Sequence, residues 1–332
     1  MHRSPDDCED MSARVLVTGA NGFVGSALCK ALSGRFLVRG AVRIPSEGSS
    51  FCVTDLVTGC LSADFDWTNA LVGVSVVVHC AARVHVISEK ATDPLAEFRR
   101  VNVEGTLRLA RQAAEAGTRR FVFVSSIGVN GCATSTQAFA AGDDVAPHTP
   151  YAVSKSEAEN GLQSLAAETG MEVVIIRPPL VYGPNAPGNF FSLMKWLTSG
   201  IPLPLGGIAE NRRSFVFIDN LVDLLVTCID HPAAANQTFL VSDGEDLSTT
   251  ALLRSMAAAL GRPARLIPVS AKLIMLGARL IGRPGIAQRL CGSLQVDIGK
   301  TRELLGWAPK ISVDEGLRRT AAHWLATQGA GK

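Results

Sequence analysis

Short apolar runs alternate with segments of helical spacing along the first half of the chain. The apolar runs predict strands at residues 15–17, 37–42, 74–78, 121–124 and 173–176. Apolar residues at helical spacing predict helices over residues 23–32, 95–116 and 152–169. Strands that alternate with helices in this way predict an α/β fold, a Rossmann-type doubly wound parallel sheet with helices on both faces.

The pattern changes after residue 178, where proline and glycine interrupt shorter segments. Apolar strands are predicted here at residues 215–218 and 238–241. We therefore expect a nucleotide-binding domain over residues 13–178 and a smaller C-terminal substrate-binding lobe over 179–328, with some segments returning to the sheet. Residues 1–12 are polar and lack an apolar signal core, so we expect a disordered extension and a cytoplasmic location.

The most apolar late stretch covers residues 266–281. It contains Lys272, Arg279 and a proline, and it is too short and too interrupted to span a bilayer. We expect a buried or interface helix, with a helix lying on a membrane surface as the alternative.

Composition narrows the class of protein. The chain has 332 residues, is 47% hydrophobic and carries a net charge of +2, which suits a protein with a large core. This charge and the 6% of aromatic residues give no reason to expect nucleic acid or an anionic membrane as the main partner. The eight cysteines form no Cys-x-x-Cys pair, so we predict reduced thiols and no metal site.

A glycine-rich turn follows the first predicted strand. Gly19, Gly22 and Gly25 would let the backbone approach a pyrophosphate, whose charge the start of the next helix would meet. The second predicted strand ends at Arg43, where proteins that bind NAD usually carry an acidic residue. A guanidinium suits a 2'-phosphate, which favours NADP(H) over NAD(H). The alternative is an arginine that points into solvent.

Tyr151 and Lys155 lie four residues apart on a predicted helix, so they share one face. We expect the ammonium to lower the pKa of the phenol and make it a proton carrier. Ser126, at the end of a predicted strand, could donate a hydrogen bond to the substrate oxygen, or it could simply cap a turn. Arg213 follows another arginine and either binds a diphosphate or lies in a solvated turn.

Together these residues closely resemble the extended short-chain dehydrogenase/reductase family, the NAD-dependent epimerase/dehydratase group. The resemblance covers the chain from Val15 to about Trp324. It rests on motifs at Thr18-Gly-x-x-Gly22-x-x-Gly25, His79-Cys-Ala-Ala82, Asn102, the trio Ser126, Tyr151 and Lys155, Arg177-Pro-Pro-Leu-Val-Tyr-Gly-Pro184, and Lys300-Thr-Arg-Glu-Leu-Leu-Gly-Trp307.

The resemblance implies a full set of site residues. Ser126, Tyr151 and Lys155 would be catalytic, and Asn102 would brace the backbone of the site. The implied substrate contacts are Arg83, Ser126, Asn189 and Arg213. The implied cofactor contacts are Gly19, Asn21, Gly22, Phe23, Val24, Gly25, Arg43, Leu61, Ala81, Ala82, Asn102, Tyr151, Lys155 and Pro178. Cys60 replaces an aspartate that often contacts adenine in this family, which puts that contact in doubt.

Departures from the family pattern indicate the branch. Ile127-Gly128 stand where sugar dehydratases carry Asp-Glu, which argues against dehydration. Arg43 favours a reductase that exchanges NADPH. We therefore predict reduction of the 4-keto group of a UDP-linked 6-deoxy-(amino)hexulose for surface polysaccharide (O-antigen) synthesis, in an enzyme able to form a homodimer. Three alternatives stay open: an NAD-dependent UDP-hexose 4-epimerase, a ketone reductase of the steroid or flavonoid type, and a non-catalytic NADP(H)-binding module.

Overall fold

The protein was analysed as a computed structural model, which describes residues 13–44, 52–84, 92–280, 282 and 284–329. The side chains of Asn189, Phe191 and Pro284 are not among the parts described. The predicted extension over residues 1–12 lies outside the described residues.

A parallel sheet forms the centre of the molecule, and it confirms the predicted α/β fold. In the described part of the chain its seven strands run in the order β3-β2-β1-β4-β5-β6-β9. The strands are β1 (Arg14–Thr18), β2 (Leu37–Val42), β3 (Asp55–Thr58), β4 (Val74–His79), β5 (Arg120–Val124), β6 (Glu172–Arg177) and β9 (Thr238–Leu240). The order reverses between β1 and β4, and ligands of doubly wound sheets bind beyond the strand ends at such a point.

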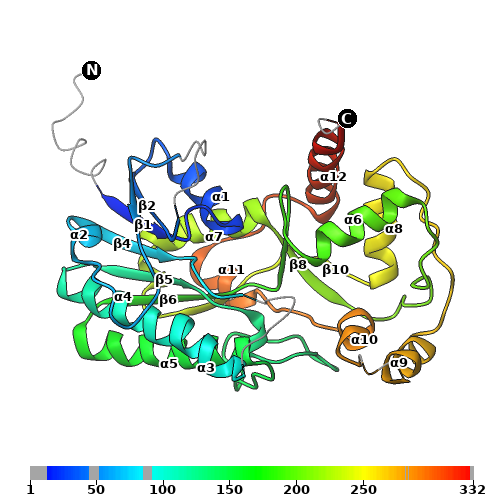
Figure 1. Ribbon diagram of the computed structural model, residues 1–332, viewed down its shortest axis with the longest axis horizontal. Coiled ribbons are helices and arrows are strands. Elements are labelled where there is room, and N and C mark those ends of the chain that lie inside the picture. Colours follow the sequence, from blue (N-terminus) through cyan, green and yellow to red (C-terminus); the bar gives the residue numbers. More distant parts are fainter. Residues whose placement is uncertain (1–12, 45–51, 85–91, 281, 283, 330–332) are drawn as a thin grey trace.

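Helices cover both faces of this sheet (Figure 1). Helices α1 (Phe23–Leu32) and α7 (Ile218–Asp230) pack together on one face, and α4 (Gly105–Glu115) and α5 (Pro150–Thr169) pack together on the other. Successive strand residues point to opposite sides of the sheet. Because helices cover both sides, the residues on both faces are buried. Val15 and Val17 belong to the core cluster that contains α1 and α7, whereas Leu16 belongs to the cluster that contains α4 and α5.

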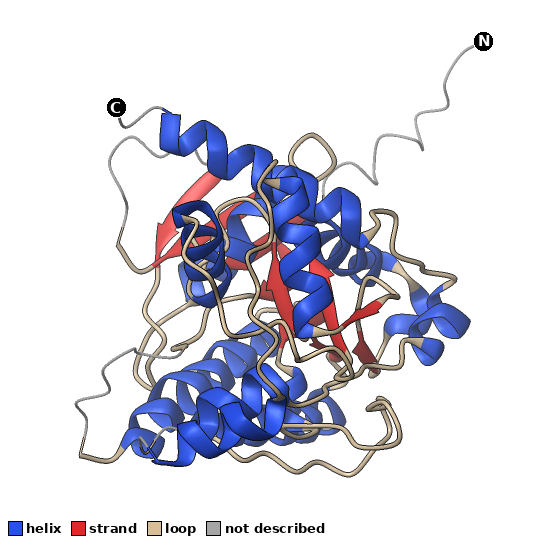
Figure 2. Ribbon diagram, turned by 90° about the vertical axis from the view of Figure 1, so that its right-hand side faces the viewer, coloured by secondary structure: helices blue, strands red, loops and turns tan. Residues whose placement is uncertain are grey.

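A smaller lobe stands beside the carboxyl edge of the sheet (Figures 1 and 2). Its three strands pair in the order β10-β8-β7. The lobe contains β7 (Leu180–Tyr182), α6 (Asn189–Ser199), β8 (Arg213–Phe217), β10 (Asp246–Leu247), α8 (Thr249–Ala259), α9 (Ala271–Leu280), α10 (Pro284–Cys291) and α12 (Val313–Gly329). Between these elements the chain returns to the sheet, where β9 pairs with β6 and α11 (Gly299–Leu305) packs on β9.

The segment predicted as one helix over residues 95–116 has three parts. Helix α3 (Pro94–Arg99) continues into a π-helical turn, η3 (Arg100–Glu104), before α4 begins. Helical periodicity is nearly the same in both kinds of turn, so the apolar pattern does not reveal the change. Strand β3, helix α2 (Thr68–Leu71) and the short 3-10 turns η4 (Ile127–Val129) and η5 (Pro232–Ala234) were not predicted.

The late apolar stretch was predicted to be a buried or interface helix, and the structure does not bury it. It forms α9 over Ala271–Leu280, and none of the residues of this helix is buried. The helix lies at the edge of the lobe (Figure 1). No helix in the described ranges is long and apolar enough to cross a bilayer.

Candidate active site

The turn between β1 and α1 is held by close backbone contacts that only glycine allows. Gly19 has a φ of +67°, and a Cβ there would lie 3.0 Å from the backbone of Ala81. A Cβ at Gly25 would lie 2.1 Å from the carbonyl oxygen of Gly19. Gly22 caps α1, and Asn21 and Gly22 are exposed. The start of α1 is therefore open to an anionic group.

The ends of β1 and β4 are joined by a buried histidine. His79 Nδ1 lies 2.7 Å from Thr18 Oγ1, and His79 Nε2 lies 3.0 Å from Thr106 Oγ1. The Ala81 N–H donates to Thr18 Oγ1 at 3.2 Å. Burial, with a smaller effect of the nearby Lys155 charge, lowers the pKa of His79 to about 3. A neutral imidazole thus fixes the two strand ends beside which the predicted cofactor contacts Gly19, Ala81 and Ala82 lie.

Asn102 lies in the π-helical turn and clamps the backbone after β4. Its Oδ1 accepts from the Arg83 N–H at 2.8 Å, and its Nδ2 donates to the Arg83 carbonyl at 3.0 Å. Nδ2 also donates to Ser154 Oγ at 3.1 Å, and Ser154 donates to the Tyr151 carbonyl at 2.8 Å. A π-turn is frequently found at functional sites. Here it connects the wall of the cofactor site with the helix that carries Tyr151.

Helix α5 presents the predicted catalytic pair to the carboxyl edge of the sheet. The helix begins at Pro150, and Thr149 Oγ1 caps it by accepting from the Ala152 N–H at 3.2 Å. Lys155 is 2% exposed, and its Nζ lies 4.0 Å from the centre of the Phe123 ring on β5. The Tyr151 ring packs edge-on against the Phe98 ring, with 6.0 Å between the ring centres. The Arg83 guanidinium lies over the same Phe98 ring, 5.6 Å from its centre.

The pKa values of Tyr151 and Lys155 differ from the expectation. Burial raises the pKa of Tyr151 to about 12, so the expected lowering by Lys155 is absent from the site as it stands. Burial lowers the pKa of Lys155 to about 7, against an opposing effect of Glu159. A bound group that supplies hydroxyl acceptors to Nζ would favour the charged lysine.

A buried ion-pair network lies one helical turn beyond Lys155. Glu159 is paired with Arg177 of β6, whose Nε donates to Glu159 Oε1 at 3.0 Å. Arg177 Nη1 donates to Asn130 Oδ1 at 2.9 Å, and Ser125 Oγ donates to Glu159. The network ties α5 to β5 and β6 directly beneath the pair. We predicted none of these roles from the sequence, because a carboxylate such as Glu159, four residues after Lys155, looks in the sequence like an ordinary charge on a helix surface.

Ser126 has the capping role that was its alternative. It precedes η4, and its Oγ accepts from the Gly128 N–H at 3.1 Å. A hydroxyl that accepts one hydrogen bond can still donate its own proton, so the cap leaves a donor for a bound oxygen. The Pro178 carbonyl accepts from the Ile127 N–H at 2.9 Å, which holds the same turn against the end of β6.

The lobe supplies a cationic corner. Arg213 begins β8, and its Nη1 donates to the Gly292 carbonyl at 3.1 Å. Burial, and then the charge of Arg289 on α10, lowers the pKa of Arg213. Two guanidinium groups close to each other are suited to a diphosphate. No motif in the sequence points to Arg289; its effect on Arg213 depends on a fold that brings α10 to β8.

The other predicted residues lie as follows. Arg43 is exposed just after β2, and Leu61 packs against Gly105, where a Cβ would lie 2.7 Å from the Leu61 backbone. Phe23 and Val24 are half-buried at the start of α1. Asn189 begins α6, but its side chain is outside the described parts. In the described ranges no group of three or more His, Cys, Asp or Glu could hold a metal ion.

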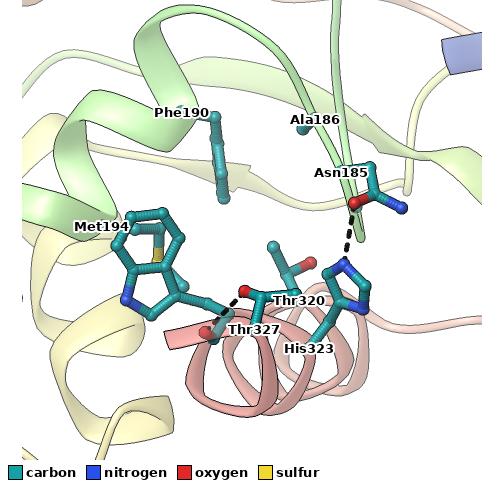
Figure 3. A pocket seen from close by; sticks show the side chains of 9 residues that line it. Asn185, Ala186, Phe190, Met194, Thr320, His323 and Thr327 are labelled. Carbon is teal, nitrogen blue, oxygen red and sulfur yellow. Dashed lines mark hydrogen bonds between the residues drawn. The ribbon is translucent and has the colours of Figure 1, made fainter. Parts of the chain in front are cut away.

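A separate cavity of about 60 Å³ lies between α6, α12 and the turn after β7 (Figure 3). His323 Nε2 lies 2.8 Å from Asn185 Oδ1 at one side of it, and Phe190 and Met194 line another (Figure 3). None of its lining residues is a predicted site residue. At this size it has room for little more than water.

This fold and this site define an NAD(P)-dependent oxidoreductase. The sequence model of the "NAD dependent epimerase/dehydratase family" matches residues 15–242, and the chain belongs to that family. It is 48% identical to a UDP-glucose 4-epimerase of Vibrio cholerae over 321 residues, 95% of this chain and 96% of that one. A UDP-glucose 4-epimerase of Mycolicibacterium smegmatis is 30% identical over 332 residues, 92% and 97% of the two chains.

A solved structure of a similar protein agrees with this family assignment. The structure titled "MoeE5 in complex with UDP-glucose and NAD" is 25% identical and has a TM-score of 0.76, over 95% of this chain and 100% of that one.

The similarity overturns the predicted 4-keto reductase, which is wrong. A 48% identical, nearly full-length relative is a 4-epimerase, which supports the epimerase alternative instead. The wrong branch was chosen largely on Arg43. In the structure this residue is exposed at the end of β2, as in the solvent-facing alternative. One exposed side chain was weak ground for choosing between two reactions that use the same fold and the same Tyr-Lys pair.

Proposed function

We propose that this protein is an NAD-dependent UDP-hexose 4-epimerase that interconverts UDP-glucose and UDP-galactose. The observation that carries the proposal is the 48% identity to a UDP-glucose 4-epimerase over nearly the whole of both chains. The site supports it with the two parts that epimerisation at C4 requires: a place for a dinucleotide at the β1–β4 switch point, and a proton carrier on α5 beside it.

The residues present fit a nicotinamide dinucleotide. The turn at Gly19, Gly22 and Gly25 leaves no space for a side chain, and it brings backbone N–H groups to the open end of α1. The buried ammonium of Lys155 suits the nicotinamide ribose hydroxyls. Further predicted contacts come from Asn21, Phe23, Val24, Leu61, Ala81, Ala82, Asn102 and Pro178. When bound, the nicotinamide accepts a hydride from C4 of the sugar and later returns it.

Tyr151 moves the proton in this scheme. As the C4–H hydride leaves, the Tyr151 phenolate takes the proton of the 4-hydroxyl, and the sugar becomes a 4-ketone. The 4-keto sugar rotates in the site and presents the opposite face of C4. The hydride returns to that face, and Tyr151 gives the proton back to the oxygen. No external oxidant or reductant is consumed. Ser126 orients the oxygen through its remaining O–H, and a charged Lys155 stabilises the phenolate.

Arg213 and Arg289 hold the diphosphate of the substrate. Their two guanidinium groups come from different elements, β8 and α10, and each can form paired hydrogen bonds with phosphate oxygens. This anchors the nucleotide side of the substrate while the hexose is free to turn. Arg83 and Asn189 remain predicted contacts to the hexose.

NAD is proposed over NADP because a similar structure is described with NAD and UDP-glucose. Arg43 remains the argument for a 2'-phosphate. A homodimer and a role in surface polysaccharide remain predictions from the family resemblance, and a cytoplasmic location remains a prediction from the sequence.

The test uses purified protein without added cofactor. Incubated with UDP-glucose, it should yield UDP-galactose, and denaturation should release NAD in an amount close to that of the protein. Reduction of a UDP-4-keto-6-deoxy sugar that depends on added NADPH, with no conversion of UDP-glucose, would overturn the proposal. Release of NADP instead of NAD would correct the cofactor and leave the reaction unchanged.

A further inference from the structure

Helix α9 carries two apolar stripes on opposite sides. Ala271, Ile274 and Ala278 are partly buried and face the lobe. Leu273, Leu276 and Leu280 have the same spacing of three and four residues, rotated to the other side of the helix, and they are 62%, 55% and 80% exposed. We name these three leucines the α9 outer face. A surface helix normally needs only the first stripe.

The sequence segment that contains this face carries charge of one sign. From residue 247 to residue 296 the sequence contains seven Lys and Arg and not a single Asp or Glu. The whole chain has a net charge of only +2, so the rest of it is net negative. Lys272 and Arg279 lie on α9 beside the leucines, are exposed, and form no ion pair within the described residues.

The position of α9 leaves the outer face accessible. The helix packs on α10, and its start is tied to the lobe through a bridge between Ser270 and Gly207. In Figure 1 the α9–α10 pair forms the corner of the lobe farthest from helices α1 and α2 of the sheet domain. Ile286 of α10, 51% exposed, adds a fourth apolar side chain to this corner.

We propose that the α9 outer face binds the surface of an anionic lipid bilayer. An apolar helix face that can enter the acyl boundary, with cations at its edge for the headgroups, is what interfacial binding requires. Pairing with a second copy of this chain is less favourable, because a two-fold contact between α9 helices would bring like charges together. Binding in this orientation would place α10, which packs on α9, near the headgroups.

Co-sedimentation of the whole protein with vesicles tests the proposal. Vesicles that contain about one-third phosphatidylglycerol should bind the protein at least about tenfold more strongly than pure phosphatidylcholine. Combined L273S, L276S and L280S should weaken binding by about 100-fold or more. Lys272→Gln and Arg279→Gln should each weaken it roughly fivefold, and only with anionic vesicles.

A matched control removes three exposed apolar side chains elsewhere. Val72→Ser, Leu304→Ser and Leu325→Ser together should leave vesicle binding unchanged. Val72 lies next to α2, Leu304 lies on α11 and Leu325 lies on α12, so none of them belongs to the α9 outer face. Melting temperatures of both triple variants establish that they fold. The proposal fails if the wild type ignores anionic vesicles, if both triple variants bind equally well, or if sedimentation shows a dimer that only the α9 substitutions dissociate. None of these readouts depends on the proposed reaction.

Discussion

Helices α5 and α9 depart from the usual distribution of side chains in opposite directions. Helix α5 buries ionisable groups, Lys155 and Glu159, whereas α9 exposes leucines. On α5 the departure is compensated inside the chain, because Arg177 and Ser125 satisfy Glu159. On α9 nothing within the described residues covers the outer face. A departure compensated internally indicates a positioned active site, and an uncompensated one indicates a partner outside the chain.

The largest effect is expected from the proton carrier on α5. Tyr151→Phe removes the hydroxyl and keeps the ring that packs on Phe98, so it should lower kcat for UDP-glucose about 1,000-fold. The melting temperature and the amount of bound nucleotide should stay close to those of the wild type. A variant that keeps more than about a tenth of the wild-type kcat would show that Tyr151 does not carry the proton.

The next effect concerns the buried network under the pair. Glu159→Gln leaves the Arg177 charge without its partner and should lower the free energy of unfolding by about 3–5 kcal/mol. Glu157→Gln is the matched control on the same helix, since Glu157 pairs with Arg99 at the surface. It should cost less than about 1 kcal/mol. Denaturant unfolding of both variants makes the comparison, and equal losses would refute the role given to the buried network.

A smaller effect of opposite sign is expected at Lys155. Its pKa in the folded protein, about 7, lies below the ordinary 10.5, so the unfolded chain binds more protons between these values. Wild-type stability therefore rises with pH through this window, and the cost of burying the ammonium is complete below pH 7. Lys155→Met should abolish activity yet raise the melting temperature by roughly 3 °C at about pH 6, with no gain above about pH 10.5. A lower melting temperature at the acidic pH would contradict it.

The smallest effect on folding is expected at α9. The combined L273S, L276S and L280S variant removes three exposed side chains and should change the free energy of unfolding by less than about 1 kcal/mol. A loss as large as that of Glu159→Gln, measured in the same denaturant titration, would mean that the outer face is part of the core, and the contrast between α5 and α9 would be lost.

The sequence predicts much of the α5 side of this contrast and little of the α9 side. Apolar runs located β1, β2, β4, β5 and β6, since buried parallel strands carry continuous apolar residues. The glycine spacing and the pair Tyr151 and Lys155 are local patterns, and the fold places them where the patterns indicate.

What sequence reasoning missed depends on long-range contacts. Strand β3 is short, and its Asp55 pairs with Arg39 of β2, a contact that no local pattern contains. The approach of Arg289 to Arg213 and the pairing of Glu159 with Arg177 likewise join distant segments. For α9 the prediction left open a buried helix, an interface helix and a helix on a membrane surface, because hydropathy does not distinguish an apolar face that is buried from one that is exposed.

The central claim, epimerisation through a retained nicotinamide, is tested most directly by following the hydrogen at C4. UDP-glucose deuterated at C4 is incubated with the purified protein in ordinary water, without added cofactor, and the product is examined by NMR and mass spectrometry. The account predicts UDP-galactose that keeps the deuterium at C4, because the same hydride leaves and returns. Product that has lost the deuterium to solvent, or no UDP-galactose at all, would contradict it.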